Sequence, residues 1–262
     1  MPGTTSPGSQ DFSDHRSGSF SGPHPDWQER TIQLLGKERF GRLEQAHVLV
    51  AGLGGVGAMA AEMICRSGVG RITIIDGDTI QPGNLNRQLP ATHQTLFRPK
   101  AEVMGERLMA INPGLRLTVL NEFIREERIP EILETPFDYV VDAIDTLSPK
   151  IYLIYHVVQK GSRLASSMGS GGKLDPAQIR VADFGETFNC RLAYILRKKL
   201  RKLGIEGGFK VVFSTERVSR EMIIPVEGER NKKSTVGTSS FIPAIFGCTL
   251  ASIVIRDLAQ AE

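Results

Sequence analysis

The stretch His47-Val-Leu-Val-Ala-Gly-Leu-Gly-Gly-Val-Gly57 joins a short apolar run to a cluster of glycines. The apolar run predicts a buried strand, and residues 58–67 after the glycines predict a helix. Glycines at such a strand-to-helix turn let the backbone approach a phosphate closely, and the N-terminus of the helix favours the anion. The candidate phosphate-binding residues are Gly52, Gly54, Gly55 and Gly57.

Polar residues in a fixed order follow the glycines. Asp76 comes directly after a second apolar run, residues 71–75, which is where a βαβ nucleotide site places its ribose-binding acid. Asp78 is a candidate ligand for Mg²⁺, although the two acids also suit a plain polar turn. The other candidate nucleotide-binding residues are Asn84, Arg87, Gln88 and Lys100.

The cations among these residues favour ATP over a dinucleotide. A dinucleotide carries one pyrophosphate, which the N–H groups of a helix nearly satisfy by themselves. ATP brings about four negative charges, which proteins neutralise with Lys, Arg and Mg²⁺. Arg87 and Lys100 are of the right type, so the sequence predicts a nucleotide triphosphate site. The alternative for Arg87 is an ordinary solvated side chain.

Strands and helices alternate along the first half of the chain, which indicates a parallel sheet with right-handed crossovers. The predicted strands lie near residues 47–51, 71–75, 117–121, 138–144 and 163–167, and the predicted helices near 27–45, 58–67, 100–111, 126–133 and 148–160. The second half adds short strands near 178–181 and 210–215, a basic helix near 192–203 and an apolar C-terminal helix. We expect a doubly wound, mostly parallel, Rossmann-like α/β sheet with an additional C-terminal α+β portion.

At 262 residues the chain is long enough for one large domain, which we place at residues 26–262. Residues 1–25 are rich in Ser, Gly and Pro and have no apolar run, so we expect a disordered tail and neither a signal peptide nor an anchor. The most apolar stretch, residues 241–255, is interrupted and shorter than the about 20 residues of a membrane span. We expect a buried helix there, for which a subunit interface is one setting.

Charge and cysteine content suit a cytoplasmic location and an acidic partner such as RNA. The net charge of +3 permits such a partner without requiring one. The three cysteines form no disulfide framework and indicate a reducing compartment. Cys65 and Cys248 are expected to be small core residues. Cys190 stays open as a nucleophile.

Together these motifs resemble the ThiF-type adenylating enzymes, the group related to the ubiquitin-activating fold that includes the thiamine and molybdopterin sulfur-carrier adenylyltransferases. The resemblance covers about residues 27–259 and includes an Asp-x-x-Asp pair, Asp142 and Asp145, at the end of a predicted strand. It implies that Asp145 contacts Mg²⁺ when ATP is bound, and that Asp142 either has a structural role or supports the residues that contact the metal. The alternative for Asp145 is a cap of the following helix. Lys150, one turn into that helix, is expected to be solvated.

Further motifs resemble one branch of this family, the tRNA threonylcarbamoyladenosine dehydratases. The chain has no Cys-x-x-Cys, so it lacks the four thiolates of the zinc site that sulfur-carrier adenylyltransferases usually have. Val211 stands where some dehydratases have a cysteine, which argues further against an obligatory thiol. The motifs that resemble the branch are Glu29-Arg-Thr31, Leu35-Gly36, Gly169-Ser-Gly-Gly-Lys-Leu-Asp-Pro176 and Val212-Phe-Ser-Thr-Glu216.

The resemblance implies ATP-dependent ring closure on a modified adenosine beside the tRNA anticodon. A threonine carboxylate would attack the α-phosphate to form an acyl-adenylate, and the neighbouring carbamoyl group would then expel AMP. Such an intramolecular attack needs no enzyme thioester. The implied catalytic residues are Arg30, Arg87, Lys100 and Asp145, with ATP and Mg²⁺ as cofactors.

Two features imply macromolecular partners. In the family the equivalent of Arg30 reaches the ATP of the neighbouring subunit, which implies a homodimer; the alternative is an ordinary arginine on a helix surface. The strongest basic cluster lies in the predicted helix 192–203, where charged residues at helical spacing share a face that suits either tRNA phosphates or plain solvent. These residues are Arg197, Lys198, Arg201 and Lys202.

The sequence leaves other functions open. An adenylyltransferase for a small ubiquitin-like sulfur-carrier protein would depend on a carrier that ends in Gly-Gly. A nucleotide-binding adaptor would not turn over ATP, and an NAD-dependent oxidoreductase would prefer a dinucleotide. Whether a sulfur-relay protein docks on the chain is likewise open.

Overall fold

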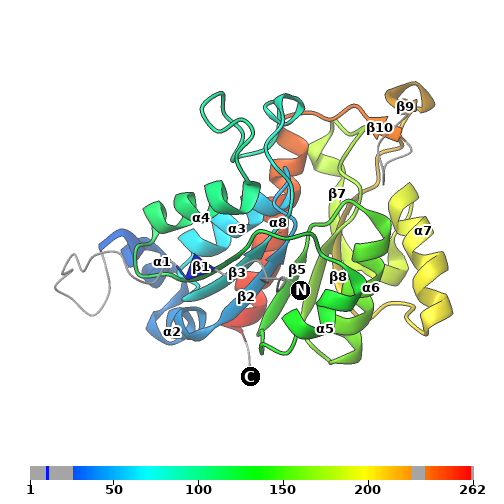
Figure 1. Cartoon of the computed structure of the whole chain (residues 1–262). Helices are drawn as coiled ribbons and strands as arrows, with labels where there is room; N and C mark the ends of the chain where they lie inside the picture. The colour runs from blue at the N-terminus through cyan, green and yellow to red at the C-terminus, as the bar shows by residue number, and fades with distance from the viewer. Residues whose placement is uncertain (1–9, 12–25, 226–233, 261–262) are drawn as a thin grey trace, which may run out of the picture.

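The computed structural model describes residues 10–11, 26–225 and 234–260, and an eight-stranded sheet runs through them (Figure 1). The strand order is β1-β4-β3-β2-β5-β6-β8-β7. The six inner strands are parallel to one another, whereas β1 and β7 at the two edges are antiparallel to their neighbours. The strands are β1 (Gln10–Asp11), β2 (His47–Ala51), β3 (Arg71–Ile75), β4 (Arg116–Leu120), β5 (Tyr139–Asp142), β6 (Leu164–Ser167), β7 (Ile179–Asp183) and β8 (Lys210–Ser214).

Helices cover both faces of the sheet, and alternate residues of the central strand β2 enter two separate cores. Val48 and Val50 face a core shared with α3 (Gly57–Arg66), α4 (Lys100–Ile111) and α8 (Phe241–Ala259). Leu49 and Ala51 face the opposite core, shared with α5 (Ile129–Ile132), α6 (Leu147–Gln159) and α7 (Arg191–Leu200). A strand buried on both faces is typical of a doubly wound α/β sheet. The predicted fold class is therefore confirmed.

The long helix that we predicted over residues 27–45 is interrupted. A 3-10 turn, η1 (Asp26–Gln28), leads into α1 (Glu29–Leu35), and α2 (Lys37–Gln45) follows after a break at Gly36. Gly36 has φ 82°, in the region that favours glycine, and ψ 155°, so it ends one helix and starts the next at a new angle. The prediction of one continuous helix was wrong at this residue.

The C-terminal portion holds more short elements than we predicted. The basic helix α7 gives way to a 3-10 turn, η6 (Arg201–Leu203), and ends at Gly204, which is left-handed. An antiparallel pair, β9 (Ile223–Pro225) and β10 (Ser234–Val236), was not predicted. The remaining 3-10 turns are η2 (Pro82–Asn84), η3 (Glu126–Arg128), η4 (Pro176–Gln178), η5 (Phe184–Glu186) and η7 (Arg220–Met222).

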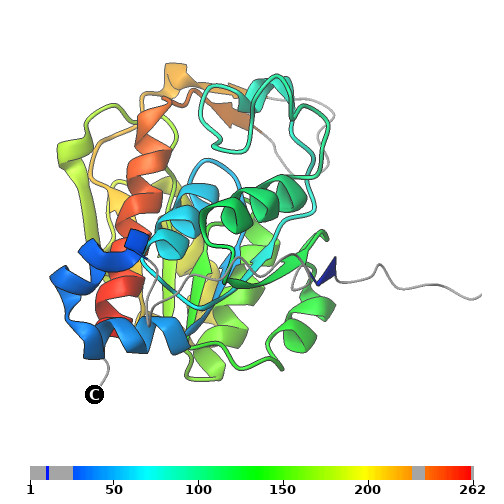
Figure 2. The same cartoon turned by 90° about the vertical axis from the view of Figure 1, so that its left-hand side faces the viewer.

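The apolar helix α8 packs as a core helix of the domain. By length and composition alone it could cross a membrane, but half of its most apolar window is buried inside the domain, and core helices of soluble proteins pass the same test. It lies against α3, α2 and strand β6 (Figure 2). The expectation of a buried helix is confirmed for about half of its residues, and Cys248 on its outer face is exposed.

The N-terminal tail enters the structure at two residues. Gln10 and Asp11 pair with Val119 and Thr118 of β4 as a short edge strand. The rest of the tail, for which we expected disorder, lies outside the described residues.

Candidate active site

The glycine loop after β2 is folded so tightly that side chains would not fit at two of its positions. Gly52 has φ 88°, and a Cβ there would lie 2.9 Å from the carbonyl oxygen of Ala143. A Cβ on Gly57 would lie 1.8 Å from the carbonyl oxygen of Gly52. The loop therefore turns directly into α3, whose first residue is Gly57. This leaves the N-terminal N–H groups of α3 at the carboxyl edge of the sheet, as the sequence predicts for a phosphate site.

Helix α8 supports this loop from the other side. A Cβ on Gly55 would lie 3.0 Å from the Cβ of Pro243 and 3.1 Å from the carbonyl oxygen of Arg87. One helical turn further along α8, a Cβ on Gly247 would lie 2.4 Å from the carbonyl oxygen of Val56. Glycine at these positions thus lets α8, the glycine loop and the segment around Arg87 meet.

Asp76 lies where β3 ends and ties two loops together. One of its carboxylate oxygens accepts a hydrogen bond of 2.7 Å from the main-chain nitrogen of Leu53, and the other accepts one of 2.8 Å from that of Asp78. Burial raises the pKa of Asp76, which the positive charge of Lys100 and the two N–H donors partly offset. Each oxygen keeps a lone pair with which it could accept a ribose hydroxyl.

Lys100 and Asp78 form an ion pair at the start of α4. The Nζ of Lys100 lies 2.9 Å from Oδ2 of Asp78, and the main-chain nitrogen of Lys100 donates to the Asp78 carbonyl. The lysine side chain is 6% exposed, whereas the aspartate side chain is 55% exposed. The ammonium is therefore fixed in place, while the carboxylate remains accessible to a cation.

The segment between β3 and α4 carries the predicted amide and arginine residues. Asn84 has a structural role, because its Oδ1 accepts a hydrogen bond from the Gln81 main-chain nitrogen and caps η2. The Arg87 guanidinium donates to the carbonyl of Gly83 and to Oδ1 of Asn86, both at 2.8 Å. In this arrangement Arg87 is half-buried and held within its own segment.

Gln88 is buried against the glycine loop with an unmet hydrogen-bonding capacity. A Cβ on Gly54 would lie 3.8 Å from its Nε2. Its Oε1 is buried and has no hydrogen-bond partner among the residues that the structure describes. Buried polar atoms are rarely left without a partner. An unsatisfied amide oxygen beside a glycine cradle fits a site that receives a polar ligand.

The Asp-x-x-Asp pair ends β5, and its first member forms a buried ion pair. Asp142 and Lys150 are both 0% exposed, and the Nζ of Lys150 lies 2.6 Å from Oδ2 of Asp142. The hydroxyl of Ser166 donates to the same oxygen at 2.6 Å. The structural role expected for Asp142 fits these contacts. The expectation that Lys150 is solvated was wrong, because the lysine points back into the sheet to neutralise a buried carboxylate.

Asp145 follows this pair at an exposed position. Thr146, not Asp145, occupies the N-cap position of α6. Over residues 10–11, 26–225 and 234–260 there is no group of three or more His, Cys, Asp or Glu that could hold a metal ion by itself. Mg²⁺ in nucleotide sites is commonly held by one or two carboxylates together with phosphate oxygens. The exposed carboxylates of Asp78 and Asp145 fit that kind of site.

Arg30 is not brought to this edge of the sheet. It is exposed on α1, beside residues that pack at the opposite edge. There Phe40 and Gln28 lie against Gly68, in the turn that leads into β3. Within one chain, the arginine therefore lies away from the glycine loop.

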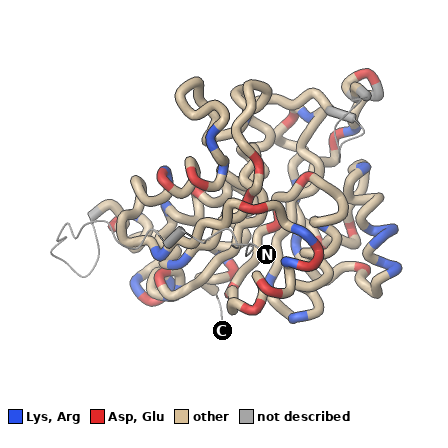
Figure 3. Tube along the Cα trace, in the orientation of Figure 1, with Lys and Arg blue, Asp and Glu red and all other residues tan. Residues whose placement is uncertain are grey.

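The basic face predicted on α7 is divided by its contacts. Arg197 is half-buried and donates to the hydroxyl of Thr187, and Arg201 lies 3.3 Å from Glu206 in an exposed ion pair. Lys198 and Lys202 remain exposed, and Lys and Arg gather along this helix and its C-terminal turn (Figure 3). Tyr194, one turn before Lys198, is 62% exposed on the same face.

The two motifs typical of the dehydratase branch contact each other. Glu216 accepts hydrogen bonds from the main-chain nitrogens of Leu174 and Asp175. Lys173 is buried and donates to the Glu216 carbonyl. Burial lowers the pKa of Lys173. The loop that follows β6 is thus bonded to the segment that follows β8, and strand β5 separates both from β2 and its glycine loop in the sheet order.

None of the three cysteines lies in the glycine cradle. Cys65 is buried in α3 with its Sγ 3.7 Å from the Leu108 carbonyl, and burial raises its pKa to about 12. Cys190 is also buried, as the N-cap residue of α7. Cys248 is exposed on α8, so the expectation that it is a core residue was wrong.

Some features of the site carry weak signals in the sequence. Phe123, just beyond β4, is 59% exposed and packs its backbone against Gly77, where a Cβ would lie 2.5 Å from the Phe123 nitrogen. It borders an open cavity of about 380 Å³. In the sequence, the position of Phe123 just after a predicted strand was the clue that it lies at this edge of the sheet. No pattern in the sequence indicates that Lys150 is buried, since its partner Asp142 lies eight residues upstream.

Comparisons with known proteins agree with this geometry. The model of the ThiF family matches residues 28–262. A tRNA threonylcarbamoyladenosine dehydratase of Bacillus subtilis is 38% identical over 238 residues, which cover 88% of this chain and 94% of that protein. The enzyme of the same name from Escherichia coli is 34% identical over 256 residues, with the same coverage of both chains.

A solved structure has the same fold over the same range. It is the Escherichia coli tRNA N6-threonylcarbamoyladenosine dehydratase TcdA in complex with ATP, which superposes with a TM-score of 0.80 at 33% sequence identity and covers 88% of this chain and 93% of that one. On the family match, on full-length relatives above 30% identity and on the shared fold, this chain belongs to the ThiF family.

Proposed function

We propose that this chain is an ATP-dependent tRNA threonylcarbamoyladenosine dehydratase. It would bind ATP and a tRNA that carries threonylcarbamoyladenosine beside its anticodon, and would close a ring on the modified base. The observation that carries the proposal is the cradle at the ends of β2 and β3. Its glycines bring the main chain of the loop close to its neighbours with no side chain between, and among the described residues the buried Oε1 of Gln88 beside Gly54 lacks a donor.

The residues around the cradle have distinct parts in ATP binding. The N-terminal N–H groups of α3 and the glycine loop hold phosphates, and Asp76 accepts the ribose hydroxyls. The ammonium of Lys100 lies at the phosphate end of the site. When ATP binds, this ammonium breaks its ion pair with Asp78 and pairs with the phosphates, which carry more negative charge. Arg87 turns from its contacts with Gly83 and Asn86 toward the phosphates. Mg²⁺, held by Asp145 and Asp78, would neutralise charge on the phosphate oxygens.

The chemistry proceeds in two steps. A carboxylate oxygen of the threonyl group attacks the α-phosphorus of ATP, which forms an acyl-adenylate and releases pyrophosphate. The neighbouring carbamoyl group then attacks the acyl carbon. The bond between the acyl carbon and the oxygen of AMP breaks, and AMP leaves. The net change on the nucleoside is the loss of one water. Arg87 and Lys100 stabilise the charge that develops on the phosphate.

This chemistry needs no covalent relay through the enzyme. The carbamoyl nucleophile is part of the same molecule as the activated carboxyl, so its effective concentration is very high. The burial of Cys65 and Cys190 and the position of Cys248 on the outer face of α8 support the proposal. We propose no thioester intermediate.

Helix α7 is the proposed tRNA surface, with a smaller set of contacts than the sequence alone suggested. Lys198 and Lys202 are exposed and would meet phosphates. Tyr194 beside them offers an aromatic face on which a base of the anticodon loop can stack. Arg197 and Arg201 already have partners in Thr187 and Glu206 and would contribute less.

Arg30 supports the proposal of a homodimer. It lies at the opposite edge of the sheet from the nucleotide site of its own chain, so it would act only on the ATP of a second subunit. We also propose a cytoplasmic location, where tRNA is modified and where three unpaired thiols persist.

The test is a reaction with purified components. With ATP, Mg²⁺ and tRNA bearing threonylcarbamoyladenosine, the chain should release AMP and pyrophosphate, and the nucleoside should lose the mass of one water. tRNA without the modification is the control and should release no AMP. AMP release that depends on a carrier protein with a Gly-Gly terminus would favour sulfur-carrier adenylation instead. No ATP turnover with any of these substrates would favour a nucleotide-binding adaptor.

A further inference from the structure

The turn between β5 and α6 is held from both sides by two buried charges. The Oδ1 of Asp142 accepts a hydrogen bond of 3.1 Å from the Ile144 main-chain nitrogen. The Nζ of Lys150 donates one of 3.1 Å to the Ile144 carbonyl oxygen. Because the two side chains also bind each other at 2.6 Å, both polar groups of the Ile144 main chain are bonded to a single ion pair.

The same turn forms one wall of the glycine cradle. A Cβ on Gly52 would lie 2.9 Å from the Ala143 carbonyl oxygen and 3.2 Å from the Ile144 nitrogen. A Cβ on Gly57 would lie 2.9 Å from the Ala143 Cβ. If this turn shifted, its main chain would therefore displace the loop that holds the phosphates. Asp145, the proposed Mg²⁺ ligand, follows the turn by one residue.

Stability alone is a poor explanation for this arrangement. Removing two charges from water costs more than their attraction commonly returns, and apolar replacements of a buried pair are often neutral or stabilising. Asp142 and Lys150 are fully buried. Ser166 on the neighbouring strand β6 also donates to Asp142, so the carboxylate is fixed relative to the sheet itself. Through these bonds the ion pair fixes the Ala143–Ile144 turn relative to the sheet.

We infer that Asp142 and Lys150 are positioning residues for adenylation. They hold the Ala143–Ile144 turn against Gly52, so that the glycine loop and Asp145 keep the relative placement that phosphate transfer needs. The inference rests on the proposed function above. Neither side chain contacts the nucleotide; both act through the main chain of the turn.

The first test is the double variant Asp142→Asn/Lys150→Met. It removes both charges together, so that no unpaired charge stays buried. The asparagine can still accept from Ile144, but the Ile144 carbonyl loses its ammonium partner. We expect a folded protein whose kcat for AMP formation falls by roughly a hundredfold, as misplacement of reacting groups by about 1 Å can cause. The KM for ATP should change by less than about fivefold, since the glycine loop and Asp76 still bind it.

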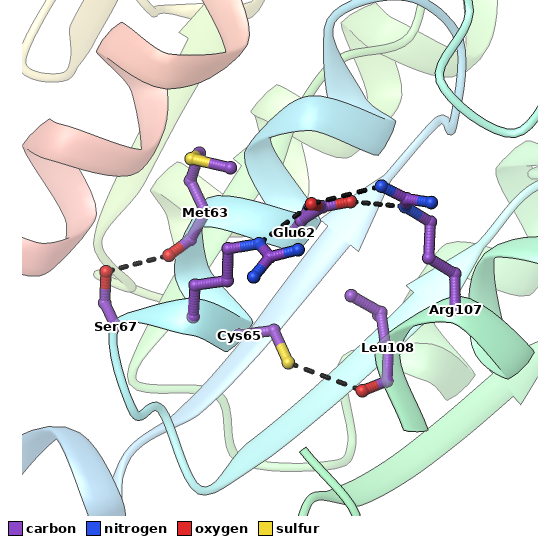
Figure 4. Close-up of polar contacts among 7 residues, drawn as sticks. Glu62, Met63, Cys65, Ser67, Arg107 and Leu108 are labelled. Carbon is purple, nitrogen blue, oxygen red and sulfur yellow. Dashed lines mark hydrogen bonds and ion pairs between the residues drawn. The ribbon is translucent and has the colours of Figure 1, made fainter. Parts of the chain in front are cut away.

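The matched control is Glu62→Gln, which perturbs another buried carboxylate. Glu62 in α3 is 6% exposed and bonds to Arg66 and Arg107, neither of which belongs to the turn; Figure 4 shows its contact with Arg107. It should lose stability but keep the wild-type kcat at a temperature where it is folded. A second readout does not need turnover: Mg²⁺-ATP should raise the Tm of wild type, of Glu62→Gln and of the double variant by similar amounts, which would show that the double variant still binds the nucleotide and loses only the transfer step.

A milder variant covers the case in which the double variant does not fold. Ser166→Ala leaves the ion pair intact and removes only its bond to β6. We expect a drop in kcat of severalfold with an unchanged KM for tRNA. The inference would be overturned if the folded double variant had the same kcat as wild type. If only Ser166→Ala folds, a kcat equal to that of wild type in this variant would overturn it. An equal loss in Glu62→Gln would also do so. A wild-type chain that binds ATP but never forms AMP would instead count against the proposed function.

Discussion

The Leu53 main-chain nitrogen donates a 2.7 Å hydrogen bond to the carboxylate of Asp76. The acid that ends β3 therefore holds the glycine loop that follows the neighbouring strand β2. In the proposed function this one carboxylate serves both the ribose and the phosphates, so a change at Asp76 should affect both.

Asp76→Ala should weaken ATP binding by about 1–3 kcal/mol, the usual cost of losing a charged hydrogen-bond partner. Calorimetric titration of ATP measures this effect. Asp183→Ala is the control, because Asp183 also accepts from two main-chain nitrogens, those of Gly185 and Gly208, but lies outside the site. Unchanged ATP affinity in Asp76→Ala, or tighter binding of NAD than of ATP by wild type, would remove Asp76 from the site.

Arg87→Ala should leave tRNA binding intact and reduce AMP release by about a hundredfold to a thousandfold, as for the loss of one transition-state donor. Among the described residues, the hydrogen bonds of this guanidinium go to its own segment, at Gly83 and Asn86. Its removal should therefore hardly change the Tm. Single-turnover measurement of AMP, together with a filter-binding assay for tRNA, separates the two effects. A parallel loss of tRNA affinity would place Arg87 on the tRNA and not on ATP.

The double charge reversal Lys198→Glu/Lys202→Glu should weaken tRNA binding. It should also reduce the magnitude of the slope of log affinity against log salt by about two, because binding releases about one counterion fewer for each phosphate contact that is lost. Lys37→Glu/Arg39→Glu on α2 makes the same change in net charge and should have little effect. Tyr194→Ala should lower the affinity by about 1–3 kcal/mol with an unchanged slope, since stacking involves no counterion. If the salt slope is the same in the α7 variant and in wild type, this helix is only solvated surface.

The triple variant Cys65→Ala/Cys190→Ala/Cys248→Ala should turn over modified tRNA at a rate within a few-fold of wild type, at a temperature where it is folded. Two of these thiols are buried and no relay is needed. Circular dichroism checks the fold, and AMP release checks the activity. A folded variant with activity reduced a hundredfold would show that a thiol takes part in the reaction.

The stability of the domain should fall as the pH drops through about 6.5. Burial lowers the pKa of His47 from its ordinary value of 6.5, with Arg71 acting in the same direction and Asp138 against it. Below 6.5 the unfolded chain binds a proton that the native chain does not yet bind, so the free energy of unfolding decreases toward acid pH. Urea denaturation between about pH 7.5 and 5.5 should show a shallower dependence in His47→Asn than in the exposed control His93→Asn.

The regular part of the fold could be predicted because local patterns determine it. Strands β2 and β3 and helix α4 begin and end at the predicted residues, since apolar runs and breaking residues coincide there. The errors arise where a distant partner decides. Lys150 looks like a solvated lysine until the turn brings it to Asp142. Arg197 looks like part of a basic face until Thr187 accepts its hydrogen bond.

Gly36 and Cys248 show the same limit in backbone and in packing. A glycine inside a helical pattern does not reveal whether the helix continues, and here it breaks at Gly36. The apolar setting of Cys248 indicates a buried helix, but not which of its faces stays open. The candidate site residues of the first half could be named from their type and order, and their roles stay predictions; their hydrogen bonds to one another could not be predicted.

The contact between Gly55 and Pro243 sets an order for the synthesis of the chain. The glycine loop emerges from the ribosome nearly 190 residues before the start of α8, which supports it. A nascent chain that has not yet reached Pro243 has the phosphate motif without its support. The capacity to bind ATP should therefore appear only after α8 has been synthesised and has docked on α3.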